Sequence, residues 1–122
     1  GAWKYFVDSV AKTGWFYDTN YKAWYLLDYT DGHMLVGWQY DKNYKSWFYL
    51  TGNGAMKVGW FYDKDYRAWF YLTGNGEMKI GWLYDNIYKA WFYLSGNGEM
   101  LIGNRSIGGK IYTFKGNGEW VS

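Results

Sequence analysis

The sequence repeats itself with a period of about 22 residues, and this repeat constrains the fold more than any other feature. Anchored on a recurring Gly-Trp pair, the full repeats begin at Trp15, Trp38, Trp60 and Trp82. One short β-hairpin buries too little surface to be stable alone, so units of this size must pack on their neighbours. We therefore expect the 122-residue chain to fold as one array of stacked repeats.

We interpret residues 1–122 as a single repeat domain with atypical ends. The four full repeats cover residues 15–37, 38–59, 60–81 and 82–103. A half repeat, 1–14, precedes them, and a degenerate capping repeat, 104–122, follows. Atypical ends are expected of an array, because a terminal repeat has no neighbour on one side.

Each full repeat has the pattern of a β-hairpin followed by a connecting turn. In the third repeat we predict strands over 59–63 and 66–72, which are rich in the aromatic residues that suit pleated surfaces. We interpret the aspartates at the hairpin turns, such as Asp63, as residues whose side chains bond the local backbone. The Gly-Asn-Gly connections contain Asn-Gly, a strong signal for a tight turn with positive φ. The sequence therefore predicts an all-β solenoid of stacked β-hairpin repeats.

Composition excludes several kinds of chemistry. The chain has no cysteine and one histidine, His33, so we expect no Cys-based or His-rich metal site and no thiol nucleophile. No serine lies in the sequence context of a catalytic nucleophile, and we interpret His33 as a solvated turn residue. The net charge of +2 comes from basic residues that are spread singly, which does not favour nucleic-acid binding. We expect a non-enzyme without metal or cofactor, and no apolar run approaches the ~18 residues of a membrane span.

Aromatic residues make up 26% of the chain, and their positions suggest repeated binding sites. Strand alternation places Trp47 and Tyr49 on one face of a strand, and Phe48 and Leu50 on the other. When hairpins stack, two tryptophans of one repeat should meet the residue after the second tryptophan of the next repeat. The predicted groupings are Trp15/Trp24 with Phe48, Trp38/Trp47 with Phe70, Trp60/Trp69 with Phe92, and Trp82/Trp91 with Tyr112.

The alternative is that the aromatic residues form only the core, with the four methionines filling gaps. We assign most tyrosines and leucines to that core. Two tryptophans per repeat, however, exceed what packing needs, and large exposed aromatic residues lower solubility. We therefore interpret the tryptophan pairs as ligand sites, and we expect Trp3 and Tyr25 to form only a partial site.

An open box of three aromatic rings suits a quaternary ammonium ion. This cation has no N–H group, so it needs π faces rather than hydrogen-bond acceptors. Each face contributes about 0.5 to 2 kcal/mol, which gives one site a Kd of order millimolar. Several weak sites on one chain bind strongly only to a polymer that displays many copies of the ligand.

The recurring pattern Gly-Trp, Trp-Phe-Tyr-Leu and Gly-Asn-Gly-x-Met resembles the choline-binding, or cell-wall-binding, repeats of Gram-positive surface proteins, autolysins and phage endolysins. The resemblance covers residues 3–103 well and 104–120 weakly. It implies hairpins wound into a left-handed superhelix, with choline held between successive hairpins at the four groupings above. It also implies a non-catalytic module that binds choline on teichoic-acid-like polymers. Such a module is secreted or lies at the cell surface, associated with the cell wall, and belongs to a Gram-positive bacterium or its phage.

Two features depart from the family pattern. The hairpins are longer than is usual and add tyrosines in or near their turns, at Tyr21, Tyr44, Tyr66 and Tyr88. Three of the four cage-closing positions hold Phe instead of Tyr. Similar repeats in clostridial toxins and glucosyltransferases bind carbohydrate, although they usually lack the second tryptophan. A glycan-binding module therefore stays the alternative to a choline-binding one.

Overall fold

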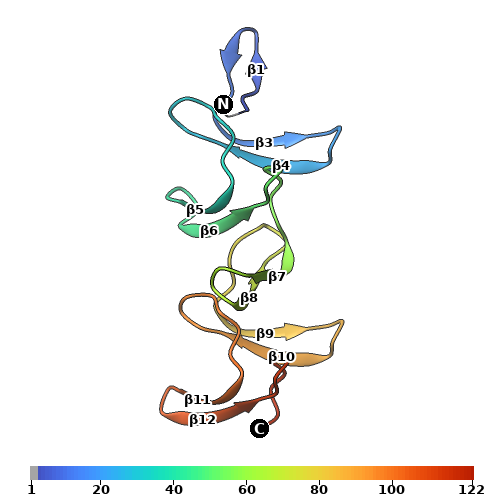
Figure 1. Cartoon of the computed structure of the whole chain (residues 1–122), viewed down its shortest axis with the longest axis vertical. Coiled ribbons are helices and arrows are strands. Elements are labelled where there is room, and N and C mark those ends of the chain that lie inside the picture. Colours follow the sequence, from blue (N-terminus) through green and yellow to red (C-terminus); the bar gives the residue numbers. More distant parts are fainter. Residues whose placement is uncertain (1–2) are drawn as a thin grey trace. The chain divides into compact units, whose positions relative to one another are not determined.

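The computed structural model describes residues 3–122, which form antiparallel β-hairpins joined by turns (Figure 1). Each strand pairs with its neighbour in sequence, from β1 with β2 to β11 with β12. The described part of the chain contains no helix that is long and apolar enough to cross a membrane. The strands are β1 (Phe6–Val7), β2 (Val10–Ala11), β3 (Gly14–Asp18), β4 (Ala23–Leu27), β5 (Gly37–Asp41), β6 (Ser46–Leu50), β7 (Gly59–Asp63), β8 (Ala68–Leu72), β9 (Gly81–Asp85), β10 (Ala90–Leu94), β11 (Gly103–Ile107) and β12 (Lys110–Phe114).

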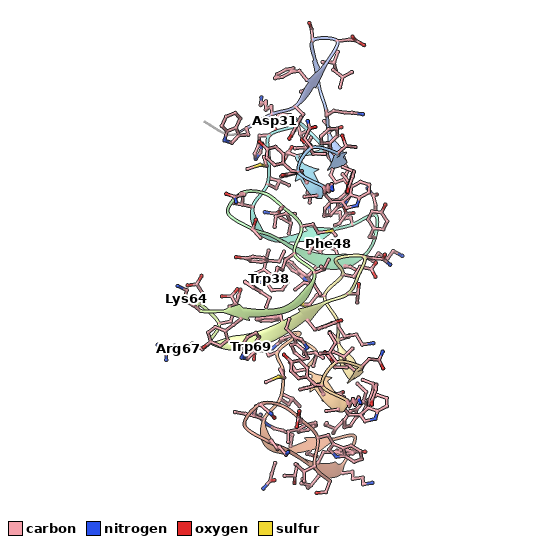
Figure 2. The ribbon with its side chains drawn as sticks, turned by 90° about the vertical axis from the view of Figure 1, so that its right-hand side faces the viewer. Asp31, Trp38, Phe48, Lys64, Arg67 and Trp69 are labelled. Carbon is pink, nitrogen blue, oxygen red and sulfur yellow. The ribbon has the colours of Figure 1, made fainter. Side chains whose placement is uncertain are left out.

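The third repeat shows how well the strands match the sequence pattern. Strand β7 has the predicted bounds, and its Gly59 pairs with Leu72 of β8. The second strand begins at Ala68 instead of the predicted Tyr66, because the turn is longer than expected. Arg67 lies in this turn with a φ of 54°, which is incompatible with a strand. Figure 2 shows Lys64 and Arg67 projecting from the turn between β7 and β8.

The chain divides into two compact units, which we describe separately. Unit 1 comprises Gly1–Val58 and Gly74–Glu77, and unit 2 comprises Gly59–Thr73 and Met78–Ser122. The predicted stacking of hairpins is confirmed within each unit by backbone hydrogen bonds between repeats. In unit 1 the N–H of Met56 donates to the carbonyl of Trp24 at 2.8 Å, and in unit 2 that of Met100 donates to Trp69 at 2.8 Å. The hand of the superhelix stays a prediction.

The core of each unit is made mainly of leucine and phenylalanine from the second strand of each hairpin. Leu50 and Phe48 are 0% and 3% exposed in unit 1, and Leu94 and Phe92 are equally well buried in unit 2. The expectation that most tyrosines belong to the core is wrong. Tyr25 is buried, whereas the tyrosines that pair with the second tryptophans are exposed, namely Tyr17, Tyr40, Tyr62 and Tyr84. They lie on the outer face of the hairpin, where their hydroxyl groups stay hydrated.

The Gly-Asn-Gly connections form the predicted tight turns. The last glycine of each has a positive φ, for example 86° at Gly76 and 92° at Gly118. A Cβ atom at Gly76 would overlap Met56, and one at Gly118 would overlap Met100. Both the backbone conformation and this close packing require glycine. Each turn therefore packs directly on a methionine of the preceding repeat.

Candidate ligand-binding pockets

Unit 1 contains a pocket of about 290 Å³, here called pocket 1, that three successive repeats build together. Strands β3 and β4 contribute the two tryptophans of the first full repeat. The second repeat contributes residues from its hairpin turn, from β6 and from the segment after β6. The Gly-Asn-Gly turn of the third repeat completes the wall. The lining residues are Trp15, Trp24, Tyr44, Phe48, Met56, Gly74, Asn75 and Glu77.

Unit 2 contains an equivalent pocket of about 220 Å³, here called pocket 2. It uses the same positions of the three later repeats. Both pockets are smaller than the roughly 300 to 1,000 Å³ typical of sites for drug-sized ligands, so they suit a small ligand or a single head group. The lining residues are Trp60, Trp69, Tyr88, Phe92, Met100, Asn117 and Glu119.

The aromatic rings meet at steep angles in both pockets. The ring centroids of Trp15 and Phe48 lie 4.9 Å apart at an interplanar angle of 61°, and those of Trp60 and Phe92 lie 5.0 Å apart at 63°. Phe48 is part of the core, whereas Trp24 is 43% exposed. Each pocket therefore has one wall anchored in the core and another that faces solvent.

A carboxylate of the second repeat holds the first tryptophan of pocket 1 in place. The indole Nε1 of Trp15 donates to Oδ2 of Asp41 at 2.8 Å. The other oxygen of Asp41 accepts hydrogen bonds from the backbone N–H groups of Asn43 and Tyr44, at 2.8 and 3.2 Å. Asp41 thus fixes both Trp15 and the turn that carries Tyr44.

Asp85 has the same role in pocket 2. Its Oδ2 accepts from Nε1 of Trp60 at 2.9 Å, and its Oδ1 accepts from the backbone N–H groups of Ile87 and Tyr88 at 2.8 and 3.0 Å. The expectation that these aspartates bond the local backbone is therefore correct but incomplete. Each also accepts a hydrogen bond from the first tryptophan of the preceding repeat.

These hydrogen bonds keep the carboxylates ionised. Burial alone would raise the pKa of Asp41, but hydrogen bonds from Tyr29, Trp15 and the turn backbone outweigh it, so the pKa lies below its ordinary value. At Asp85 burial is likewise outweighed by the bonds from Trp60 and the turn backbone, which lower the pKa. An ionised carboxylate is a stronger acceptor for the indole N–H than a neutral group.

The structure brings together two of the four predicted groupings as pocket walls. Trp15 and Trp24 lie with Phe48 in pocket 1, and the third grouping lies in pocket 2. The grouping of Trp38 and Trp47 with Phe70 joins residues of the two units and stays a prediction. Sequence reasoning did not assign the other lining residues to the sites. These are the turn tyrosines Tyr44 and Tyr88, the methionines Met56 and Met100, the turn glycine Gly74, and the polar residues Asn75, Asn117, Glu77 and Glu119.

The fourth predicted grouping forms a different cluster in unit 2. The ring of Trp82 lies 6.3 Å from Trp91 and 5.2 Å from Tyr112, as predicted, but it also lies 5.9 Å from Trp120. Trp120 takes the place of the pocket methionine. Its backbone forms an isolated β-bridge with Phe114, as the backbone of Met100 does with Leu94. The cluster also lacks the turn aspartate, whose position in β11 is Ile107.

The expected partial site at the front is not a cage in the described residues. Trp3 is 76% exposed, and Tyr25 is buried beside Tyr5, with their ring centroids 6.2 Å apart. The hydroxyl of Tyr5 donates to Oδ2 of Asp18 at 2.6 Å, and this bond raises the pKa of Tyr5 to about 12. Tyr5 thus makes the hydrogen bond that a first tryptophan makes in the full repeats.

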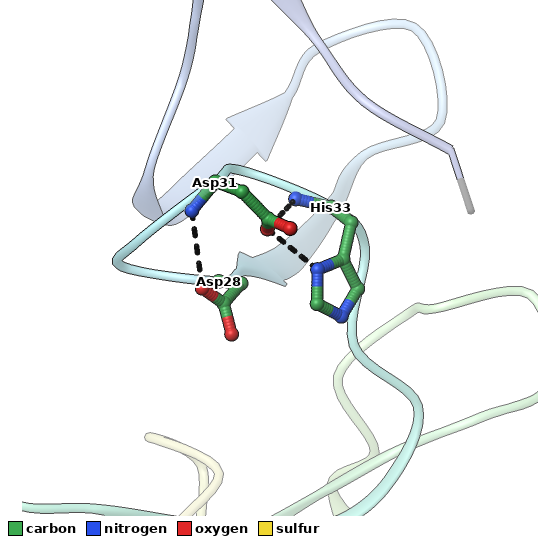
Figure 3. A group of neighbouring side chains, drawn as sticks. All are labelled: Asp28, Asp31 and His33. Carbon is green, nitrogen blue, oxygen red and sulfur yellow. Dashed lines mark hydrogen bonds and ion pairs between the residues drawn. The ribbon is translucent and has the colours of Figure 1, made fainter. Parts of the chain in front are cut away.

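Asp28, Asp31 and His33 form a cluster outside both pockets (Figure 3). Their potential ligand atoms lie within 4.8 Å of one another. Asp31 Oδ1 lies 2.6 Å from His33 Nδ1 and accepts the backbone N–H of His33, while Asp28 Oδ1 accepts the N–H of Asp31 at 3.2 Å. These bonds, led by those from His33, lower the pKa of Asp31. The cluster is accounted for as a hydrogen-bonded turn, so His33 is paired instead of simply solvated.

Comparisons with known proteins find similar solved structures. No protein-family model matches the chain, and no curated protein matches it. Choline binding protein F from Streptococcus pneumoniae, solved in the presence of a peptidoglycan analogue, matches all of the chain at 41% identity and a TM-score of 0.83. CbpJ from Streptococcus pneumoniae matches 92% of the chain at 38% identity and a TM-score of 0.81. The chain spans 38% and 36% of the lengths of these two proteins.

A third structure is matched over nearly its whole length. The choline binding domain of Spr1274 in Streptococcus pneumoniae is 32% identical, with a TM-score of 0.59, and the match covers 72% of this chain and 96% of that domain. Alternansucrase in complex with isomaltononaose is only 19% identical, with a TM-score of 0.51, over 92% of this chain and 10% of the enzyme. That likeness shows a shared fold alone.

Proposed function

The chain belongs to the choline-binding repeat family, and from this premise we propose that it is a non-catalytic cell-wall-binding module that holds choline in pockets 1 and 2. The observation that carries the proposal is the equivalent composition of the two pockets. Each combines two tryptophans, a phenylalanine, a turn tyrosine and a methionine.

These side chains match the chemistry of a trimethylammonium group. The group is apolar at its surface, carries a positive charge and has no hydrogen to donate, so aromatic faces and a polarizable thioether suit it. Three or four faces at about 0.5 to 1 kcal/mol each support a Kd of order millimolar for one pocket. Binding of this kind needs no buried hydrogen-bond network.

Weak sites repeated along one chain favour a polymeric ligand. Once one pocket holds a choline group, the others meet a high local concentration of the remaining groups on the same polymer, and the affinities multiply. A choline-decorated teichoic acid of the bacterial cell wall has this form. We therefore propose that the protein is secreted or displayed at the surface of a Gram-positive bacterium, or belongs to its phage, and acts by attachment to the wall.

The positions of the acidic residues support a binding role instead of catalysis. The carboxylates beside the pockets, Asp41 and Asp85, already accept bonds from a tryptophan and from the turn backbone, and each pocket has a single glutamate in its lining. The histidine lies in the Asp31–His33 turn, outside both pockets. The pocket residues thus offer surfaces for recognition and no arranged pair of nucleophile and base.

A titration with choline, followed by tryptophan fluorescence, tests the proposal. We expect saturation in the millimolar range and a rise in Tm, because a ligand that binds only the folded state stabilises it. Trp24→Ala and Trp69→Ala should each reduce the stoichiometry by about one site and weaken binding to choline-bearing polymer by more than that share. His33→Ala is the control and should bind normally. Ammonium at equal ionic strength that produced the same effect as choline would contradict the proposal.

A saccharide is the second candidate ligand. Asn75 and Asn117 place an amide beside the aromatic walls of pockets 1 and 2, and such amides bond sugar hydroxyl groups while a ring stacks on the sugar face. Dextran and cell-wall saccharides should therefore be titrated in parallel. If a saccharide changes the fluorescence and choline does not, the glycan function replaces the choline function.

A further inference from the structure

Each pocket contains one glutamate at the same position of the repeat. Glu77 lines pocket 1 and Glu119 lines pocket 2, and each follows directly after a Gly-Asn-Gly turn. The side chain is not needed for the turn. The turn before Ala55 has the same backbone hydrogen bonds, with Thr51 donating to Ala55 at 2.9 Å as Lys115 donates to Glu119 at 2.8 Å. The two glutamates therefore call for another explanation.

The Gly-Asn-Gly turn that is followed by alanine packs at the front of the chain, where the aromatic cage is incomplete. The turn that ends at Ala55 packs through Gly54 on Met34, and the N–H of Met34 donates to the carbonyl of Trp3. At this place the half repeat supplies Tyr5 instead of a first tryptophan. Of the three turns that end in glutamate, two pack on Met56 and Met100, which line the complete pockets, and the third, ending at Glu99, packs through Gly98 on Met78. Both complete pockets therefore have a glutamate, whereas the incomplete cage has alanine.

We propose that Glu77 and Glu119 give each pocket an anionic wall that selects cationic ligands over neutral ones of the same shape. This inference rests on the proposed choline function and deepens it. A carboxylate cannot accept a hydrogen bond from a quaternary ammonium group, so it attracts that group by charge alone. A neutral ligand of the same shape gains no such Coulombic attraction. For charges a few ångströms apart near a protein surface, we expect a difference of about three- to tenfold in Kd.

The two anionic walls do not carry the same effective negative charge. In pocket 2 the Nζ atom of Lys115 lies 3.5 Å from Oε1 of Glu119 and offsets part of its charge. The corresponding position four residues before Glu77 is Thr73, which carries no charge. We therefore infer that pocket 1 binds a quaternary ammonium more tightly than pocket 2. Lys115 is then a specificity-determining residue that weakens its own pocket.

The methionines allow each pocket to be read separately. Met56 lines pocket 1 and Met100 lines pocket 2, so in protein labelled with ¹³C at the methionine methyl groups each signal reports its own site. The four methionine signals can be assigned with Met→Leu variants, which keep side-chain volume nearly constant. Choline and 3,3-dimethyl-1-butanol, its neutral isostere, are the two probes.

We expect choline to saturate the Met56 signal at a lower concentration than the Met100 signal. Glu77→Gln should raise the choline Kd at Met56 about threefold or more and leave Met100 unchanged, and Glu119→Gln should do the reverse. Lys115→Thr should lower the choline Kd at Met100 by about two- to threefold. None of the three should change the Kd of the neutral isostere. Higher salt should reduce the differences for choline.

Two variants outside the pockets serve as matched controls. Asp65→Asn removes one negative charge and Lys64→Thr one positive charge from the exposed β7–β8 turn. Both should leave the Kd values unchanged. Equal loss of choline and isostere binding in the Gln variants would show a purely steric role and overturn the inference. Unchanged choline binding in these variants would overturn it as well, while the choline function stands. If choline shifts no methionine signal in the unsubstituted protein, the proposed function itself fails.

Discussion

The indole of Trp15 and the carboxylate of Asp41 are joined by a hydrogen bond of 2.8 Å across two successive repeats. The same bond, at 2.9 Å, joins Trp60 to Asp85 in unit 2. Because each aspartate also holds the backbone of its own hairpin turn, the first tryptophan of a pocket and the turn tyrosine of the same pocket share one anchor. This arrangement makes the geometry of a pocket depend on a residue that does not line it.

Replacing Asp85 with asparagine should loosen pocket 2 without unfolding its turn. The remaining oxygen of Asp85→Asn can still accept the backbone N–H groups, but the new NH₂ group faces the N–H of Trp60, and two donors cannot bond. We expect a loss of about 1 to 2 kcal/mol in the free energy of unfolding, measured with urea, and weaker choline binding at Met100. Asp65→Asn, which alters an exposed turn carboxylate, should change neither quantity. Equal behaviour of the two variants would contradict the anchor role.

Acid should release both anchors in a defined window. The pKa values of Asp41 and Asp85 are lowered in the folded state, so these groups bind a proton more readily when unfolded. Their stabilising contribution is complete above the unfolded pKa of about 3.9 and is lost as the pH falls through the folded values. The contribution of these two groups to the free energy of unfolding should therefore be constant from neutral pH to about pH 5 and decline below about pH 4. Tryptophan emission during an acid titration measures this, and a midpoint near pH 6 would contradict it.

The turn tyrosines should contribute to binding. The ring centroids of Tyr44 and Phe48 lie 6.2 Å apart in pocket 1, and those of Tyr88 and Phe92 lie 6.2 Å apart in pocket 2. Removal of one π face should raise the choline Kd of that pocket by about two- to tenfold. Tyr44→Ala and Tyr88→Ala are therefore expected to weaken binding at Met56 and Met100, respectively. Tyr21→Ala, at the equivalent position of the first repeat, is the control because Tyr21 lines neither pocket.

Two glycines of one turn should differ in their tolerance of a methyl group. Gly76 has a φ of 86° and no room for a Cβ beside Met56, whereas a Cβ on Gly74 meets no atom within 4 Å. Gly76→Ala should destabilise the protein by more than about 1 kcal/mol and disturb pocket 1. Gly74→Ala should stay within about 0.5 kcal/mol of the parent protein. Urea unfolding of the two variants makes the comparison, and equal stabilities would contradict it.

Much of the fold could be predicted from local patterns. The Asn-Gly turns, the bounds of the first strands and the alternation of Trp47 and Phe48 all follow from residues close together in sequence. The groupings in pockets 1 and 2 could be predicted as well, because they need only the assumption that neighbouring hairpins stack. The exposed tyrosines could not, since an amphipathic ring is compatible with either face of a hairpin.

The remaining pocket residues could not be predicted, because their positions depend on the rise from one hairpin to the next. Glu77 belongs to the second repeat after Trp15, and sequence alone does not reveal that a connecting turn reaches back so far. The second role of Asp41 was hidden for another reason. Its turn motif already accounts for a carboxylate at that position, so nothing in the sequence indicates that the other oxygen has a partner in the preceding repeat.

Three repeats are needed to build one pocket, and this sets how such a chain gains or loses function through gene rearrangement. A single excised repeat carries the walls of no complete site. We expect duplication of an internal repeat to add one pocket when the new copy packs on its neighbours as the repeats do within each unit. We expect in-frame loss of an internal repeat to remove one pocket. On the proposed function, avidity for a polymer should therefore change in whole steps, by recombination between similar stretches such as 38–59 and 60–81, without any new side chain having to arise.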